Sequence, residues 1–171
     1  DSSAALRDVA AGLLAEPRPA AAAPRAVDDP PVPGSLVDLM TTLESVGDRT
    51  LVHRTSPSRY VAYLGRPPAD PAEDDQLRLV SGDLSPYAAE VAGIIAAAVD
   101  RDLAPHVMVV GAGAGGVVAA ELAAIDRPLP FVVDQVVTAG APAAQVPRLP
   151  RATRMLALED RADPVAVLGS L

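Results

Sequence analysis

The chain has 171 residues, a length that fits one globular domain with a substantial hydrophobic core. Half of the residues are hydrophobic, cysteine and lysine do not occur, and the formal net charge is −8. These properties exclude disulfides, thiolate metal sites and a cysteine nucleophile, and they argue against nucleic acid as a partner, because no basic stripe or aromatic platform is visible.

The first 34 residues divide into two segments. Residues 1–16 predict a short amphipathic helix, because their apolar residues recur at helical spacing. Residues 17–34 are rich in proline and alanine, a composition that is typical of a semi-rigid linker or a surface strap. A helix and a linker are therefore expected ahead of a domain that spans residues 35–171.

The expected domain begins with a helix and a hairpin. Ser35 is the predicted N-cap of a helix that ends at Gly47. Two β-rich runs follow at residues 50–54 and 59–64, and the short turn between them gives hairpin spacing. Residues 65–83 are polar, acidic and rich in proline, and they predict a loop.

Helices and buried strands alternate in the rest of the chain. Ser85 and Pro86 form an N-cap and N1 pair for the helix with the clearest periodicity. The expected elements are a helix, a strand, a helix and two strands, at residues 86–98, 106–110, 115–124, 131–138 and 154–158. This alternation predicts a three-layer α/β fold, in which a mostly parallel sheet is flanked by helices.

A glycine-rich turn, GAGAGG at residues 111–116, joins a predicted buried strand to a predicted helix. Only residues without a large side chain allow so tight a turn while the helix packs on the sheet. The turn has the spacing of the G-x-S-x-G nucleophile elbow, in which a strained turn lifts a serine off the end of a strand. Gly111, Gly113 and Gly115 form this frame, and Gly113 stands at the serine position.

The segments on both sides of the turn resemble a family of actinobacterial α/β-hydrolases over residues 84–165. Upstream, LSPYAAEVA at residues 84–92 resembles the helix before the elbow strand. Downstream, VDQVVTAGAP at residues 133–142 resembles the next strand and its G-[SA]-P turn. MLALEDRADPV at residues 155–165 resembles the strand that carries the acid loop. The resemblance implies a compact or truncated α/β-hydrolase fold, with Asp163 at the position of the triad acid.

The departures from this family imply that catalysis is lost. A triad needs a nucleophile, an imidazole that takes its proton and a carboxylate that orients the imidazole. Gly113 has no side chain, and no histidine follows Asp163, since His53 and His106 lie upstream. We therefore expect a pseudoenzyme without cofactor, which acts as a structural or protein-binding subunit with a protein partner or a second copy. Its vestigial elbow is Gly111, Gly113 and Gly115, and its vestigial acid is Asp163.

A dinucleotide-binding protein is a second interpretation of the same turn. Gly111, Gly113 and Gly116 match G-x-G-x-x-G after a strand and before a helix, so the helix N-terminus would hold the pyrophosphate of NAD(P) or FAD. Asp134 would bind a ribose hydroxyl. Against this, Asp134 lies inside an apolar run rather than at the end of its strand, and the fingerprint usually opens its domain.

The turn is also compatible with an active serine esterase whose nucleophile and histidine are not represented in this chain, and with a glycine turn that serves close packing alone. Residues 106–125 are long and apolar, but their four glycines and Glu121 make a poor membrane span, so no membrane insertion is expected. The arginines of residues 148–154 are interpreted as a solvated strap rather than an anion site. A cytoplasmic location is favoured over export after processing.

Overall fold

The computed structural model of the protein describes residues 30–67, 84–142 and 145–159. The chain divides into two units, residues 1–30 and residues 31–171, and every element below belongs to the second unit. The predicted helix at residues 1–16, most of the predicted linker at residues 17–34 and Asp163 lie outside the described residues.

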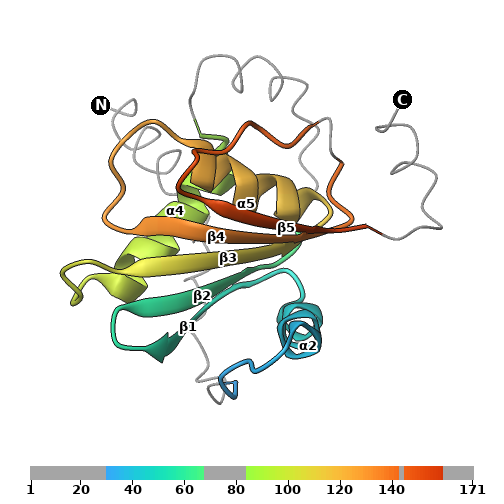
Figure 1. Cartoon of the computed structure of the whole chain (residues 1–171), viewed down its shortest axis with the longest axis horizontal. Helices are drawn as coiled ribbons and strands as arrows, with labels where there is room; N and C mark the ends of the chain where they lie inside the picture. Colours follow the sequence, from blue (N-terminus) through green and yellow to red (C-terminus); the bar gives the residue numbers. More distant parts are fainter. Residues whose placement is uncertain (1–29, 68–83, 143–144, 160–171) are drawn as a thin grey trace, which may run out of the picture. The chain divides into compact units, whose positions relative to one another are not determined.

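The described helices and strands follow the predicted order (Figure 1). They are α2 (Leu36–Val46), β1 (Thr50–Ser56), β2 (Arg59–Leu64), α4 (Pro86–Val99), β3 (His106–Ala112), α5 (Ala114–Ala124), β4 (Val132–Ala139) and β5 (Arg154–Leu158). The strands form one five-stranded sheet in the order β1-β2-β3-β4-β5. β1 is antiparallel to β2, and all other neighbouring strands are parallel. The predicted α/β class with a mostly parallel sheet is therefore confirmed.

Local sequence explains where the helices begin and end. The hydroxyl of Ser35 accepts a hydrogen bond from the Asp38 N–H at 3.2 Å, and the hydroxyl of Ser85 accepts one from the Ala88 N–H at 3.2 Å. The N–H groups in the first turn of a helix have no acceptor within the helix, and these hydrogen bonds satisfy two of them. Gly47 ends α2 with a φ of 69°. The predicted caps are confirmed.

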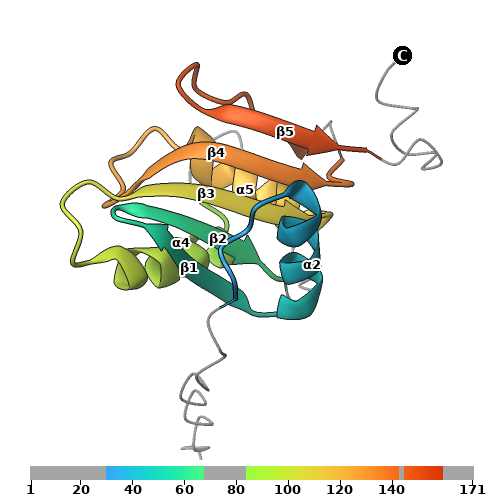
Figure 2. The same ribbon diagram turned by 60° about the horizontal axis from the view of Figure 1, so that its bottom comes forward.

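Helices cover both faces of the sheet. Figure 2 shows α2 on one face, with α4 and α5 on the other. Leu122 of α5 packs with Val109 of β3 in one hydrophobic cluster. Leu43 of α2 packs with Val110 and Tyr63 in a second cluster. Successive residues of a strand point to opposite faces, so β3 contributes Val109 to one cluster and Val110 to the other. The three layers follow from this alternation.

The strand order explains why the two faces are covered unequally. β2, β3 and β4 are neighbours in the sheet and successive along the chain, and α4 and α5 connect them. Parallel crossovers are right-handed, so crossovers that add strands in one direction place their helices on the same face. The connection from β4 to β5 contains no α-helix in its described residues. Among the described helices, the opposite face is therefore covered by α2, which contacts β2 and β3.

Residues 154–158 form a strand as predicted, but the prediction that this strand is buried is wrong. β5 spans Arg154–Leu158 as predicted, but its first four residues are exposed and Leu158 is half-buried. β5 is an edge strand of the sheet, so its apolar run does not have neighbours on both sides. β4 is buried mainly in its second half. A short apolar run indicates a strand, but its place in the sheet depends on distant segments.

The apolar segment at residues 106–125 does not form a single helix. Its first part is β3 and its second part is α5, with the glycine turn between them. In the part of the chain that the structure describes, no helix has the length and apolar character needed to span a bilayer.

A buried carboxylate links α4 to α5. Glu121 lies in α5 and is 9% exposed. Its carboxylate oxygens accept hydrogen bonds from the backbone N–H of Ser85 at 2.5 Å and from the Ser85 hydroxyl at 3.0 Å. Ser85 is the N-cap of α4, where the helix dipole stabilises a negative charge. Glu121 therefore holds the start of α4 against α5.

We expect Glu121→Ala to lower the free energy of unfolding by about 1–3 kcal/mol, because the substitution leaves the partly buried N–H and hydroxyl of Ser85 without this acceptor. Urea denaturation monitored by circular dichroism measures the change. Glu90→Ala is the control, because Glu90 is exposed on α4, and we expect a change within about 0.5 kcal/mol. Equal losses for the two variants would contradict the role of Glu121 as a link.

The ionisation of tyrosine should depend on the folded state. Burial raises the pKa of Tyr63 and of Tyr87, and a hydrogen bond to Asp102 is the largest cause that raises the pKa of Tyr60. A pKa that is higher in the folded state stabilises the fold below the unfolded pKa, near 10, and this contribution is lost as the pH rises through the folded pKa.

We therefore expect the free energy of unfolding to fall above about pH 10, with tyrosinate absorbance appearing as the fold is lost. Parallel titrations by ultraviolet absorbance and circular dichroism test this. Complete ionisation near pH 10 with native circular dichroism would contradict the burial of these rings.

Candidate functional site

The glycine turn places one residue in a strained conformation at the carboxyl end of β3. Gly113 is the N-cap of α5 and has φ 52° and ψ −123°. A residue with a side chain rarely adopts this φ, because its Cβ meets the backbone. An ideal Cβ on Gly113 would have no heavy atom of another part of the protein within 4 Å. A side chain at this position would therefore be strained but would project into open space.

The neighbouring glycines allow α5 to approach the sheet closely. An ideal Cβ on Gly111 would overlap the carbonyl group of Gly115. An ideal Cβ on Gly115 would lie 3.1 Å from the carbonyl oxygen of Gly65, which follows β2. One on Gly116 would lie 2.9 Å from the Cβ of Ala141, which follows β4. The start of α5 is thus in close contact with segments on both sides of β3.

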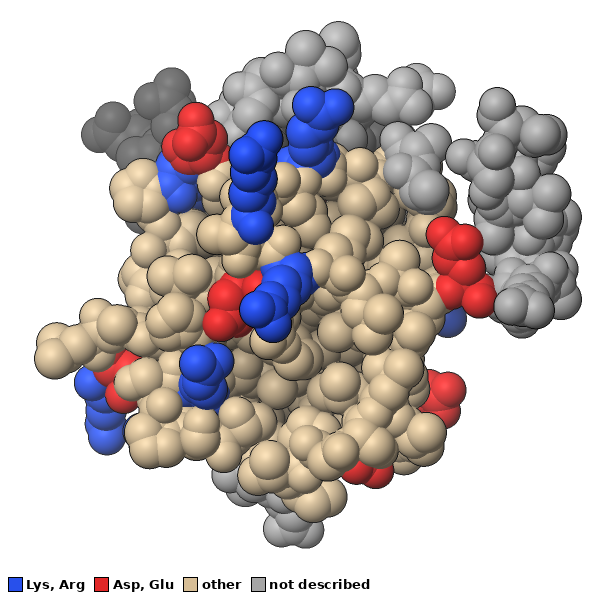
Figure 3. Space-filling view, in the orientation of Figure 1, with Lys and Arg blue, Asp and Glu red and all other residues tan. Residues whose placement is uncertain are grey.

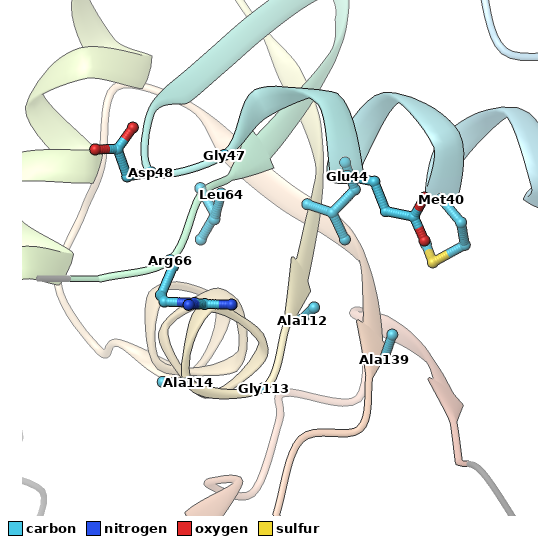
Figure 4. Close-up of a pocket in the computed structure, with 11 residues that line it drawn as sticks. Met40, Glu44, Gly47, Asp48, Leu64, Arg66, Ala112, Gly113, Ala114 and Ala139 are labelled. Atoms are coloured by element: carbon cyan, nitrogen blue, oxygen red, sulfur yellow. The ribbon is translucent and has the colours of Figure 1, made fainter. Parts of the chain in front are cut away.

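A pocket of about 880 Å³ opens beside this turn, at the carboxyl ends of the parallel strands (Figure 4). It is lined by the ends of the strands, the start of α5, the end of α2 and the loop after β2. The lining residues are Met40, Leu43, Glu44, Gly47, Asp48, Leu64, Arg66, Ala112, Gly113, Ala114 and Ala139. The strand ends and α5 contribute small or apolar side chains, whereas α2 and the loops contribute the charges. The pocket is therefore lined by small and apolar side chains together with the charged side chains of Glu44, Asp48 and Arg66.

The backbone donors beside the pocket are partly used within the protein. The N–H of Gly113 donates to the carbonyl oxygen of Ala139 at 2.8 Å, and the N–H of Arg66 donates to the carbonyl oxygen of Gly47 at 3.0 Å. Pro67 follows Arg66 and has no N–H. The described part of the loop after β2 therefore offers neither of these two backbone donors to an oxyanion near Gly113, although the side chain of Arg66 lines the same pocket.

Asp134 lies at the opposite end of the sheet from the glycine turn. It is near the start of β4, where the register with β3 shifts. Its Oδ2 atom lies 3.2 Å from Nδ1 of His106 and 3.6 Å from the guanidinium of Arg59, and both residues begin their strands. Strand β3 separates this end from Gly113 by about 20 Å. A pyrophosphate held at the glycine turn would therefore place its ribose far from Asp134.

The histidines are also away from the pocket. His53 is buried in β1, and its Nδ1 atom has no hydrogen-bond partner in the described part of the protein. His106 is at the amino end of β3, as the sequence predicts. Asp163 lies outside the described residues. Among the residues that are described, no group of three histidine, aspartate or glutamate side chains could hold a metal ion.

The contribution of α2 to the site was not predictable from sequence reasoning. The sequence indicates a capped amphipathic helix, but α2 and the glycine turn are more than sixty residues apart in the chain. No local pattern shows that the end of α2 faces the carboxyl ends of β3 and β4. Packing of Leu43 and Val46 on the sheet places it there.

Comparisons of the chain with protein-family models, with curated proteins and with solved structures find no match. The geometry of the chain itself therefore carries the inference of function.

Two glycine substitutions test the strained turn. We expect Gly113→Ala to lower the free energy of unfolding by about 1–3 kcal/mol, because any side chain is strained at this φ. Gly93→Ala is the matched control, because its Cβ would also have no heavy atom within 4 Å but Gly93 lies inside helix α4. We expect Gly93→Ala to raise the free energy of unfolding by up to about 1 kcal/mol. A stabilising Gly113→Ala in urea denaturation would contradict the conformation of the turn.

Proposed function

We propose that this chain is a catalytically inactive α/β-hydrolase-like domain that acts as a structural or protein-binding subunit. The observation that carries the proposal is the conformation of Gly113. A nucleophile elbow presents its serine from a sharp, strained turn between a strand and a helix. Gly113 is in a turn of this kind, with open space before it and no side chain to act as a nucleophile.

The surroundings of Gly113 support the same proposal. Gly111 and Gly115 flank it in close contact with neighbouring backbone, as the two glycines of the elbow frame must be. A nucleophile also needs a base within hydrogen-bond reach. Neither His53 nor His106 is among the residues that line the pocket. The arrangement retains the shape of an elbow without the groups that would make it react.

A dinucleotide site has less support. Open α/β sheets bind dinucleotides in a crevice at the carboxyl ends of the strands, where the strand order reverses. The parallel strands of this sheet follow one another in chain order, so the described sheet has no such reversal. Asp134, the candidate for ribose binding, is at the wrong end of the sheet. The glycine turn by itself is a weak signal for a nucleotide.

The absence of hydrolysis is directly testable. We expect the purified protein to hydrolyse p-nitrophenyl acetate no faster than the buffer, and to take no label from a fluorophosphonate that modifies activated serines. Gly113→Ser supplies a hydroxyl in open space, and we expect it to add no turnover, because no imidazole lines the pocket. Turnover by the wild-type protein that survives repurification and is stopped by the fluorophosphonate would overturn the proposal.

Native mass spectrometry of the protein purified from its source tests the binding role. We expect a complex whose mass exceeds that of the chain by one or more polypeptides. A bound dinucleotide in stoichiometric amount would instead assign the turn formed by Gly111, Gly113 and Gly116 to phosphate binding.

A further inference from the structure

One part of the sheet is left without a covering layer among the described residues. On the face that carries α2, the side chains of β4, β5 and the adjoining part of β3 form a surface that we call the open face, made of Met108, Val132, Gln135, Leu156 and Leu158. Val132 is 52% exposed and Leu156 is 47% exposed, and the other three are half-buried. Figure 1 looks onto this face, with α2 at one side of it.

The register of the strands places these residues on one side of the sheet. Leu156 pairs with Val137, which is buried in the cluster that includes α2. Met108 and Leu158 pack at the margin of the same cluster. The crossover helices α4 and α5 both cover the opposite face. Among the described helices, none therefore lies beside α2 to cover β4 and β5.

The open face has room for one helix. Parallel sheets are normally covered on both faces, because their strands carry apolar side chains on both sides. A helix with its side chains is about 10 Å across, which is about twice the distance between neighbouring strands of a sheet. A helix laid beside α2 would therefore cover β4 and β5. A second sheet could not lie flat on this face, because α2 stands above it.

The amino end of the open face is basic. Arg59, His106 and Arg154 begin β2, β3 and β5, and the exposed Arg151 lies just before β5. Asp134 is the acidic group at this end, and it is paired with Arg59 and His106. In Figure 3 most basic side chains lie over the left and upper part of this face, where acidic side chains stand beside some of them, and further acidic side chains lie along its right-hand rim. The left side is where the strands begin. Arg154 has no carboxylate within salt-bridge distance among the described residues.

We propose that the open face binds an amphipathic helix of a partner protein. Its apolar stripe lies on Met108 and Leu156, and aspartate or glutamate side chains near one end meet Arg154 and the other basic groups. An amphipathic helix laid in an apolar groove is recognised through residues at i, i+3, i+4 and i+7, and opposite charges at the rim set its direction. This inference rests on the proposed protein-binding function and adds the surface and the chemistry of the partner.

A photo-crosslinking amino acid tests the open face in the full chain, expressed in cells of its source. It replaces Leu156 in one variant and Met155 in the control. Met155 is the neighbouring residue of β5, 37% exposed, and it points to the opposite face. We expect the variant at position 156 to capture one polypeptide, and the control to capture little of it. The crosslinked segment, mapped by mass spectrometry, should have apolar residues at helical spacing and flanking acidic residues.

A charge substitution tests the direction of binding in the same assay. We expect Arg154→Gln to reduce the crosslinking yield at position 156 by up to about fivefold, the effect of losing one exposed ion pair. Arg49→Gln removes the same charge from an exposed residue between α2 and β1, and we expect the yield to stay unchanged. Circular dichroism checks that each variant is folded.

Several outcomes would overturn the inference: equal yields at positions 155 and 156, crosslinks to a second copy or to residues of the same chain, or a captured segment that is basic or lacks an apolar stripe. The proposed function is tested separately, by the bound mass in native mass spectrometry. A bound polypeptide without a crosslink at position 156 would leave the protein-binding function in place and assign it to another surface. Absence of both would end both proposals.

Discussion

The start of α5 lies in close contact with the sheet, and this contact positions both the helix and the pocket beside it. At Gly111, Gly115 and Gly116 the backbone lies so close to its neighbours that an added Cβ atom would clash with a neighbouring group or lie unusually close to it. This approach lets α5 bury small side chains over β3 and β4, and it brings the strained Gly113 to the mouth of the pocket. A chain with only four aromatic residues relies on such contacts, because close packing of small side chains must supply much of the dispersion energy of its core.

The right-handed crossovers determine which face of the sheet each helix covers. Two right-handed crossovers between successive neighbouring strands put α4 and α5 on one face, where Glu121 and Ser85 join them. The other face receives α2, which comes from an earlier part of the chain. Because α2 packs near the carboxyl ends of β2 and β3, it closes one side of the pocket and leaves β4 and β5 open. The pocket and the open face are thus two consequences of one asymmetric arrangement.

The two ends of the sheet have different chemistry. The carboxyl end carries the glycine turn and the pocket, whereas the amino end carries the network in which Asp134 meets His106 and Arg59. In the sequence, the glycines and Asp134 form a plausible nucleotide fingerprint, because their spacing along the chain is acceptable. Spacing along the chain does not say at which end of its strand a residue lies. The register of β4 with β3 decides this, and it separates the two features by the length of a strand.

Local sequence specifies the elements that depend on neighbouring residues: the helices capped by Ser35 and Ser85, the hairpin of β1 and β2, the parallel character of the later strands and the turn at Gly113. Each follows from local conformational preferences or from short-range periodicity. Three features are visible in the folded chain alone: β5 is an exposed edge, α2 forms a wall of the pocket, and Asp134 is remote from Gly113. These features depend on contacts between segments that are distant in the chain, and such contacts leave no pattern in any short stretch of residues.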